Sequence, residues 1–232
     1  MRRFCVIYGL LLAAGCTSKE KPPPPTPAPA PVEPAAKVVD AVATKEGLEP
    51  GSHDAAAAPA PVTVAPPKVY RTVDHTGDSM VGGGLCKALA PRFKEEGTKF
   101  VRDVWESASI SAFDESDRIP TLMKRYDPDL VLLTLGANDV FNDHPEYMAK
   151  HIESIVKKVG HRDCIWIGPP LWKGDKGLVE VIRQHSAPCR FYDSQGLTLQ
   201  RAGDGIHPTE KGGEVWAAAF WPFFKGETDG GR

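Results

Sequence analysis

The chain has 232 residues, of which 41% are hydrophobic and 25% are charged, a composition typical of a globular protein. The formal net charge of −2 provides no electrostatic basis for binding nucleic acid or an anionic membrane surface. Most of the 22 prolines lie between Pro22 and Pro67, so the composition divides the chain into two physically different parts.

The N-terminus has the pattern of an export signal. Arg2 and Arg3 precede an apolar run at residues 4–14 that is too short to span a bilayer. Ala13-Ala14-Gly15-Cys16 follows and resembles the bacterial lipobox, in which the cysteine is acylated and becomes the new N-terminus. We therefore expect residues 1–15 to be a lipoprotein signal peptide and Cys16 to carry lipid. An ordinary signal peptide or an uncleaved anchor is the alternative.

Residues 16–67 predict a disordered tether between the lipidated Cys16 and a folded domain at 68–232. Their Pro- and Ala-rich composition offers too little apolar bulk to bury in a core. Thr17 follows the cysteine in place of an aspartate retention signal. By analogy with lipoproteins, this favours an outer-membrane anchor facing the periplasm. Alternatively, Pro22–Pro25 is a polyproline segment that docks on a partner.

From residue 68 onward, apolar runs alternate with helical patterns. Strands are expected at Val69–Val73, Phe100–Val104, Leu130–Leu135, Ile165–Gly168 and Phe191–Asp193. Helices are expected at Val81–Phe93, Ile119–Arg125, Tyr147–Val159, Leu178–Gln184 and Glu214–Phe224. This order predicts an α/β fold, a three-layer α/β/α sandwich around a mostly parallel five-stranded sheet. Ligands of such sheets bind beyond the carboxyl ends of the strands.

Three sequence blocks follow expected strands or precede the last helix. They are Gly77-Asp78-Ser79, Gly136-Ala137-Asn138-Asp139 and Asp204-Gly205-Ile206-His207. In this order they resemble the blocks of the SGNH (GDSL-like) hydrolase family, over about 165 residues. The resemblance implies a flavodoxin-like SGNH fold, a serine esterase activity that uses no cofactor, and catalytic roles for Ser79, Asp204 and His207.

The residue chemistry agrees with those roles. A serine hydroxyl becomes a good nucleophile when an imidazole takes its proton, and a carboxylate three residues earlier can orient that imidazole. Each block also has a purely structural reading. Ser79 would be a helix N-cap, and Asp204–Thr209 would be a turn into a capped helix.

The oxyanion hole is expected to use the Asn138 amide and the backbone N–H of Ser79. The structural alternative for Asn138 is an Asx-turn, and Asp139 is assigned mainly to that structural role. The family usually has a glycine after the second strand, whereas this chain has Trp105-Glu106-Ser107-Ala108-Ser109-Ile110. Any residue supplies an N–H, and we expect Ser109 to supply it here.

Cysteine usage fits an oxidising compartment. Cys164 and Cys189 each begin an apolar β-like run, so a disulfide joins them if the two strands are neighbours. Cys86 is then expected to be a buried helix thiol. Aromatic residues expected near the rim of the site are Phe141, Trp166 and Trp172. The sequence has no Cys/His cluster at metal-ligand spacing.

Together these features predict a cell-envelope esterase that hydrolyses, or transfers, short acyl groups such as acetyl on carbohydrate. The substrate would be an acylated carbohydrate or a lipid ester, and the N-terminal lipid would contact the membrane. One alternative is a lysophospholipase or general lipid esterase. Another is a non-catalytic envelope-binding lipoprotein that keeps the fold, which the absent second-block glycine favours.

Overall fold

A computed structural model describes residues 68–230, so the signal peptide, Cys16 and the tether lie outside the described residues. The strands are β1 (Thr72–Gly77), β2 (Lys99–Val104), β3 (Leu130–Thr134), β4 (Asp163–Ile167) and β5 (Arg190–Tyr192). The helices are η1 (Val81–Leu85), α1 (Cys86–Glu95), α2 (Ile110–Glu115), α3 (Arg118–Tyr126), η2 (Pro145–Met148), α4 (Ala149–Val159), α5 (Leu178–His185) and α6 (Glu210–Phe224). Within 68–230, every helix is too short or too polar to cross a membrane.

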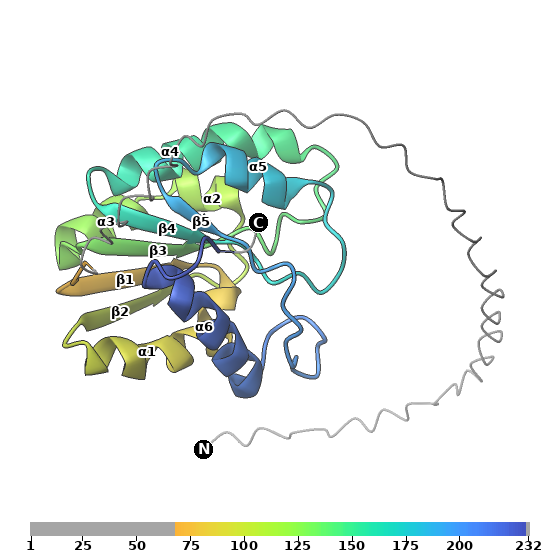
Figure 1. Ribbon diagram of the computed structural model, residues 1–232. Coiled ribbons are helices and arrows are strands. Elements are labelled where there is room, and N and C mark those ends of the chain that lie inside the picture. The colour runs from red at the N-terminus through yellow and green to blue at the C-terminus, as the bar shows by residue number, and fades with distance from the viewer. Residues whose placement is uncertain (1–67, 231–232) are drawn as a thin grey trace, which may run out of the picture. The chain divides into compact units, whose positions relative to one another are not determined.

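The five strands form one parallel sheet in the order β2-β1-β3-β4-β5. Helices α1 and α6 cover one face, and α2, α3, α4 and α5 cover the other, which gives three layers (Figure 1). β3 lies at the centre and is buried along its whole length, as a strand covered on both faces requires. The expected three-layer α/β/α sandwich is therefore confirmed, and the sheet is parallel throughout.

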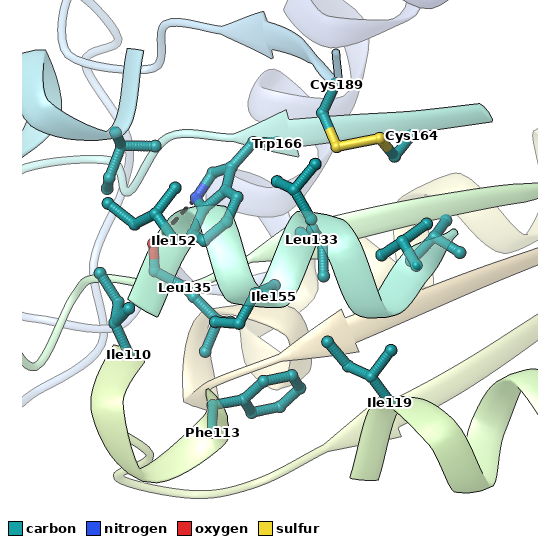
Figure 2. Packing of buried hydrophobic residues seen from close by; sticks show 14 of the residues in the cluster. Ile110, Phe113, Ile119, Leu133, Leu135, Ile152, Ile155, Cys164, Trp166 and Cys189 are labelled. Atoms are coloured by element: carbon teal, nitrogen blue, oxygen red, sulfur yellow. Dashed lines mark hydrogen bonds between the residues drawn. A yellow bond between two sulfur atoms is a disulfide. The ribbon is translucent and has the colours of Figure 1, made fainter. Parts of the chain in front are cut away.

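Each face of the sheet has its own apolar core. On the α2–α5 face, Phe113, Ile155 and Trp166 are fully buried around β3 and β4 (Figure 2). The Trp166 indole donates a hydrogen bond to the Leu135 carbonyl, 3.3 Å away, inside this core (Figure 2). Trp166 is therefore a packing residue and does not reach the rim of the site, contrary to the expectation from sequence, because its strand turns it inward.

Cysteine chemistry separates into two environments. A disulfide joins Cys164 in β4 to Cys189, which immediately precedes β5, with the two Cα atoms 4.6 Å apart (Figure 2). Cys86 is a free, buried thiol at the start of α1, and its Sγ lies 3.3 Å from Nδ1 of His75. Burial lowers the pKa of His75 to about 3, so the imidazole is neutral in the core.

Two features of the fold differ from the sequence prediction. β1 covers Thr72–Gly77 instead of Val69–Val73, and it carries Asp74, His75 and Thr76 in buried positions. Those polar residues mask the strand pattern, and only pairing with β2 and β3 makes the segment a central strand. The short helix α2 was not predicted, because its six residues are too few for a clear helical period.

Glycines allow the segment after β1 to meet the start of α6 backbone to backbone. Gly84 has φ +87°, and a Cβ there would lie 2.5 Å from the Thr209 carbonyl oxygen. Gly213, on α6, would place a Cβ 2.2 Å from the carbonyl carbon of Gly84. Any side chain at this contact would push η1 and α6 apart. Of the three glycines near the start of the expected helix, Gly84 is the one that this close packing requires.

The Asp74 carboxyl on β1 is buried, and no hydrogen bond within residues 68–230 offsets the loss of its hydration. Both of its oxygens lack a hydrogen-bond partner among residues 68–230. Burial and the nearby Asp103 charge raise the pKa of Asp74 to about 7, although Arg118 opposes the shift. The unfolded chain releases this proton near pH 4, so the native state binds more protons than the unfolded state between those two values. The stability that the native state gains by holding this proton more tightly is fully present below pH 4 and is lost as the pH rises through 7.

We expect Gly213→Ala to destabilise the domain by about 2 kcal/mol, although alanine is the better helix former by about 1 kcal/mol. The reason is the clash of the new methyl group with the Gly84 backbone. Urea unfolding followed by circular dichroism measures the change. Glu214→Ala, at the exposed neighbouring position, is the matched control and should change stability by less than about 0.5 kcal/mol. A Gly213→Ala protein as stable as wild type would contradict the packing argument.

We expect Asp74→Asn to gain stability relative to wild type as the pH rises from 4.5 to 8.5, by at least about 1 kcal/mol, because each unit of pKa difference is worth about 1.4 kcal/mol. Unfolding in urea at both pH values gives the difference. The comparison isolates Asp74 because both proteins share all other titrating groups. If the difference in free energy of unfolding between wild type and Asp74→Asn is the same at both pH values, Asp74 is ionised throughout the range and the raised pKa is refuted.

Candidate active site

Ser79, His207 and Asp204 form one chain of hydrogen bonds, although Ser79 and His207 are 128 residues apart in sequence. The Ser79 Oγ lies 2.8 Å from Nε2 of His207, and the Nδ1 of the same ring lies 2.7 Å from the Asp204 carboxylate. The side chains of His207 and Asp204 are 37% and 45% exposed, so the site is open to water. This geometry is the one that proton transfer from a serine hydroxyl requires.

The Asp204 carboxylate is held in its charged form. Hydrogen bonds from the His207 ring and from the backbone N–H groups of Ile206 and His207 lower the pKa of Asp204 to about 2. Asp204 is thus a permanent acceptor at neutral pH. A permanent acceptor fixes the ring orientation and stabilises an imidazolium as it forms.

The loop that carries His207 is tied down by backbone pairing and by Arg201. The Ala202 N–H donates to the His207 carbonyl at 2.8 Å. The Arg201 guanidinium donates to the carbonyls of Pro170 and Leu171, at 3.0 and 2.9 Å, and also to that of Ile206. Arg201 therefore joins the loop after β4 to the loop that carries His207, a role that sequence analysis did not assign.

Two buried carboxylates connect the loops around Ser79. Asp78 accepts hydrogen bonds from the backbone N–H groups of Met80, Gly136 and Ala137, at 2.9, 3.2 and 3.1 Å. Burial raises the pKa of Asp78 to about 7, whereas these three donors favour the carboxylate. Asp139 accepts from the Ile110 N–H at 2.9 Å. Its structural role therefore spans two loops and goes beyond a local Asx-turn.

The oxyanion candidates do not all lie at the site. Asn138 lines the hollow beside Ser79, and its amide donates to the Ala108 carbonyl at 3.0 Å. Ser79 begins a helical turn, where backbone N–H groups have no partner within the helix. Ser109 is outside the hollow, because its hydroxyl caps α2 by accepting from the Ala112 N–H. Of the residues after β2, Glu106 and Ser107 line the hollow, and the backbone N–H of Ser109 as an oxyanion donor stays a prediction.

Ser107 adopts the left-handed backbone conformation, with φ +59°. A non-glycine residue in this region is uncommon and costs of order 1 kcal/mol. Ser107 thus makes a left-handed turn in the glycine-free segment 105–111. The sequence did not single out Ser107, because Ser107, Ser109 and Ser111 all lie in the same short segment.

A hollow of about 260 Å³ adjoins the Ser79 hydroxyl. Its lining residues are Ser79, Met80, Glu106, Ser107, Ala137, Asn138, Phe141, Trp172, Ile206 and His207. Phe141 and Trp172 pack edge to face, with ring centroids 5.7 Å apart, and form an aromatic side of the hollow. These two residues therefore lie where the sequence placed them. Among residues 68–230, no group of three or more His, Cys, Asp or Glu side chains has a metal-binding arrangement.

Comparison with known proteins yields structural similarity only. No family model matches the sequence, and no curated protein matches it. The solved structure of TesA superposes with a TM-score of 0.53 at 19% identity, covering 68% of this chain and 99% of that chain. An acetyl xylan esterase, AlAXEase, superposes with a TM-score of 0.52 at 16% identity, covering 66% of this chain and 98% of that chain. The described domain therefore shares its three-layer α/β/α fold, with a five-stranded parallel sheet, with TesA and AlAXEase.

Proposed function

We propose that this chain is a serine esterase of the SGNH type. The observation that carries the proposal is the unbroken hydrogen-bond chain from Ser79 through His207 to Asp204, beside an open hollow at the carboxyl ends of parallel strands. Structural packing does not require a serine, an imidazole and a carboxylate in this order at a water-exposed surface. Nucleophilic catalysis does.

The reaction proceeds in two steps. The Ser79 oxygen attacks the ester carbonyl while His207 takes the hydroxyl proton, and the imidazolium then protonates the leaving alcohol. The Asn138 amide and the backbone N–H groups of Ser79 and Ser107 hold the oxyanion. His207 next removes a proton from water, or from a sugar hydroxyl in a transferase, while that oxygen bonds to the acyl carbon. The bond between this carbon and the Ser79 oxygen then breaks, and the imidazolium returns a proton to Ser79. Each hydrogen-bond donor to the oxyanion lowers the activation barrier by roughly 3 kcal/mol.

The size of the hollow supports a short acyl group such as acetyl. A volume of about 260 Å³ lies below the usual range of small-molecule pockets, which is about 300–1,000 Å³. The polar and aromatic lining suits a carbohydrate that carries this ester. The similarity to an acetyl xylan esterase points in the same direction. We therefore favour O-acetylated carbohydrate as the substrate class.

We also propose that the enzyme works at the cell envelope. The lipobox-like Ala13-Ala14-Gly15-Cys16 would attach it to the outer membrane through lipid on Cys16, facing the periplasm. Residues 16–67 would then separate the catalytic domain from the membrane and give it access to glycans of the envelope.

We expect Ser79→Ala and His207→Ala each to lower turnover of p-nitrophenyl acetate by roughly 10⁴–10⁶, because the two groups act as one unit. Steady-state kinetics measures the loss, and circular dichroism checks that both variants remain folded. A fluorophosphonate probe should label the wild type and leave Ser79→Ala unlabelled. Near-normal turnover in either variant would refute the assignment. A folded wild type that neither reacts with the probe nor hydrolyses esters would instead favour a non-catalytic envelope-binding protein.

Acyl-chain preference separates carbohydrate deacetylation from lipid hydrolysis. We expect kcat/KM on p-nitrophenyl esters to be highest for acetate and to fall as the acyl chain lengthens, because Phe141 and Trp172 bound a small hollow. The measurement is a series from two to twelve carbons, at concentrations below micelle formation. Strong preference for chains beyond about eight carbons would overturn the carbohydrate assignment and support a lysophospholipase.

A further inference from the structure

A second hollow, of about 420 Å³, lies at the edge of the sheet on the same side as Ser79. The residues that matter here are Asp103, Trp105, Asp117, Arg118, Thr121 and Arg125. They come from the end of β2 and from α3 with its N-terminal flank. The proposed ester chemistry uses none of them.

The two hollows are neighbours. β2 pairs with β1, and the Trp105 N–H continues this pairing by donating to the Gly77 carbonyl at 2.9 Å. Adjacent strands lie about 4.8 Å apart, so Trp105 follows β2 beside the point where Ser79 follows β1. Glu106 and Ser107 line the catalytic hollow, and Trp105 lines the second one. A chain-like substrate that extends from Ser79 past Glu106 would therefore next reach Trp105.

Trp105 is a half-buried platform that packs against the core, with the Phe113 ring centroid 6.1 Å from its own. The Arg118 guanidinium lies 5.5 Å from the centre of the Trp105 ring. The same guanidinium donates to both carboxylate oxygens of Asp103, at 2.5 and 2.8 Å, and to the Val104 carbonyl at 2.8 Å. Arg118 therefore occupies part of the ring surface, and the remaining part of the indole that lines the hollow is fixed, so a ligand that contacts it costs little side-chain entropy.

Three polar side chains around this platform have unused hydrogen-bonding capacity. Asp117 precedes α3 without capping it, and neither its carboxylate nor the Thr121 hydroxyl has a hydrogen-bond or ion-pair partner within residues 68–230. The Arg125 guanidinium lies over the Tyr126 ring, 5.1 Å from its centre, and makes no hydrogen bond or ion pair within residues 68–230. A rigid indole surrounded by free donors and acceptors suits a ligand with apolar C–H faces and many hydroxyl groups.

We propose that the Trp105 hollow binds a sugar unit of a glycan chain while an adjacent unit presents its ester to Ser79. This inference rests on the proposed esterase function and deepens it, because it makes the substrate an oligomeric or polymeric glycan. A fatty acyl chain suits the site poorly, because the exposed Asp117 carboxylate and Arg125 guanidinium would lose hydration against hydrocarbon with no hydrogen bonds in return.

The test compares O-acetylated tetrasaccharides of β-1,4-linked xylose and of β-1,4-linked N-acetylglucosamine with the corresponding O-acetylated monosaccharides. In the wild type, kcat/KM for at least one tetrasaccharide should exceed that for its monosaccharide by about tenfold or more. The reason is that the tetrasaccharide gains binding energy from an additional sugar unit in the Trp105 hollow. Trp105→Ala should remove most of this advantage. Thr121→Phe, a change at an exposed helix position, should do the same by filling the hollow.

Tyr147→Ala is the matched control, because Tyr147 is an exposed aromatic residue that lines neither hollow, and it should retain the wild-type ratio. If Trp105→Ala unfolds, Thr121→Phe alone decides the matter. A tetrasaccharide advantage that is absent in the wild type, or unchanged in Thr121→Phe, would overturn the proposal.

Calorimetry with the unacetylated tetrasaccharides separates this proposal from the esterase function. Ser79→Ala protein should bind one of them, and the double variant Ser79→Ala, Thr121→Phe should bind it at least about tenfold more weakly. If Ser79→Ala binds a tetrasaccharide in this way but the wild type hydrolyses no ester, the sugar subsite is supported and only the esterase function is refuted. Active enzyme whose Ser79→Ala form binds neither tetrasaccharide would refute the subsite and leave the esterase function standing.

Discussion

The Asp78 carboxylate accepts hydrogen bonds from backbone N–H groups that follow two neighbouring strands, and it is fully buried while doing so. A buried carboxylate with fewer partners would be costly, so the loops after β1 and β3 are held in the one arrangement that supplies all three donors. This arrangement places Ser79 next to Asn138 at the same edge of the sheet. The candidate site therefore depends on one buried acceptor that takes no direct part in the proposed chemistry.

The approach of His207 to Ser79 depends on a different constraint. Gly84 and Gly213 bring η1 and α6 together at backbone distance, and the loop before α6 carries His207. Arg201 then fixes this loop to the carbonyls of Pro170 and Leu171, next to Trp172. The position of the imidazole and the shape of the aromatic side of the hollow are thereby coupled. Steric packing and hydrogen bonding each supply one part of a geometry that neither would produce alone.

The environment of the candidate site is open and polar. His207 and Asp204 remain more than one-third exposed, and a second hollow, lined in part by Trp105, lies beside the catalytic one. Water can reach an acyl group on Ser79, and an extended substrate can lie across both hollows. Such a surface suits a large hydrophilic substrate that cannot be enclosed, in agreement with an envelope glycan as the proposed target.

Sequence periodicity alone determined the order of strands and helices, because buried strands such as Leu130–Thr134 and helices such as α4 keep their apolar pattern. The three sequence blocks, through their resemblance to the SGNH family, marked Ser79, Asn138 and His207 as candidates. The apolar runs that begin at Cys164 and Cys189 predicted a disulfide on the condition that the two strands are neighbours, which the structure meets. Only the tertiary structure decided that Thr72–Gly77 is a central strand despite Asp74 and His75, and that Ser107 lines the hollow beside Ser79 whereas Ser109 caps α2. The physical reason is the same in both cases. Burial, loop conformation and backbone contacts between distant segments depend on which parts of the chain meet, and a local sequence pattern does not contain that information.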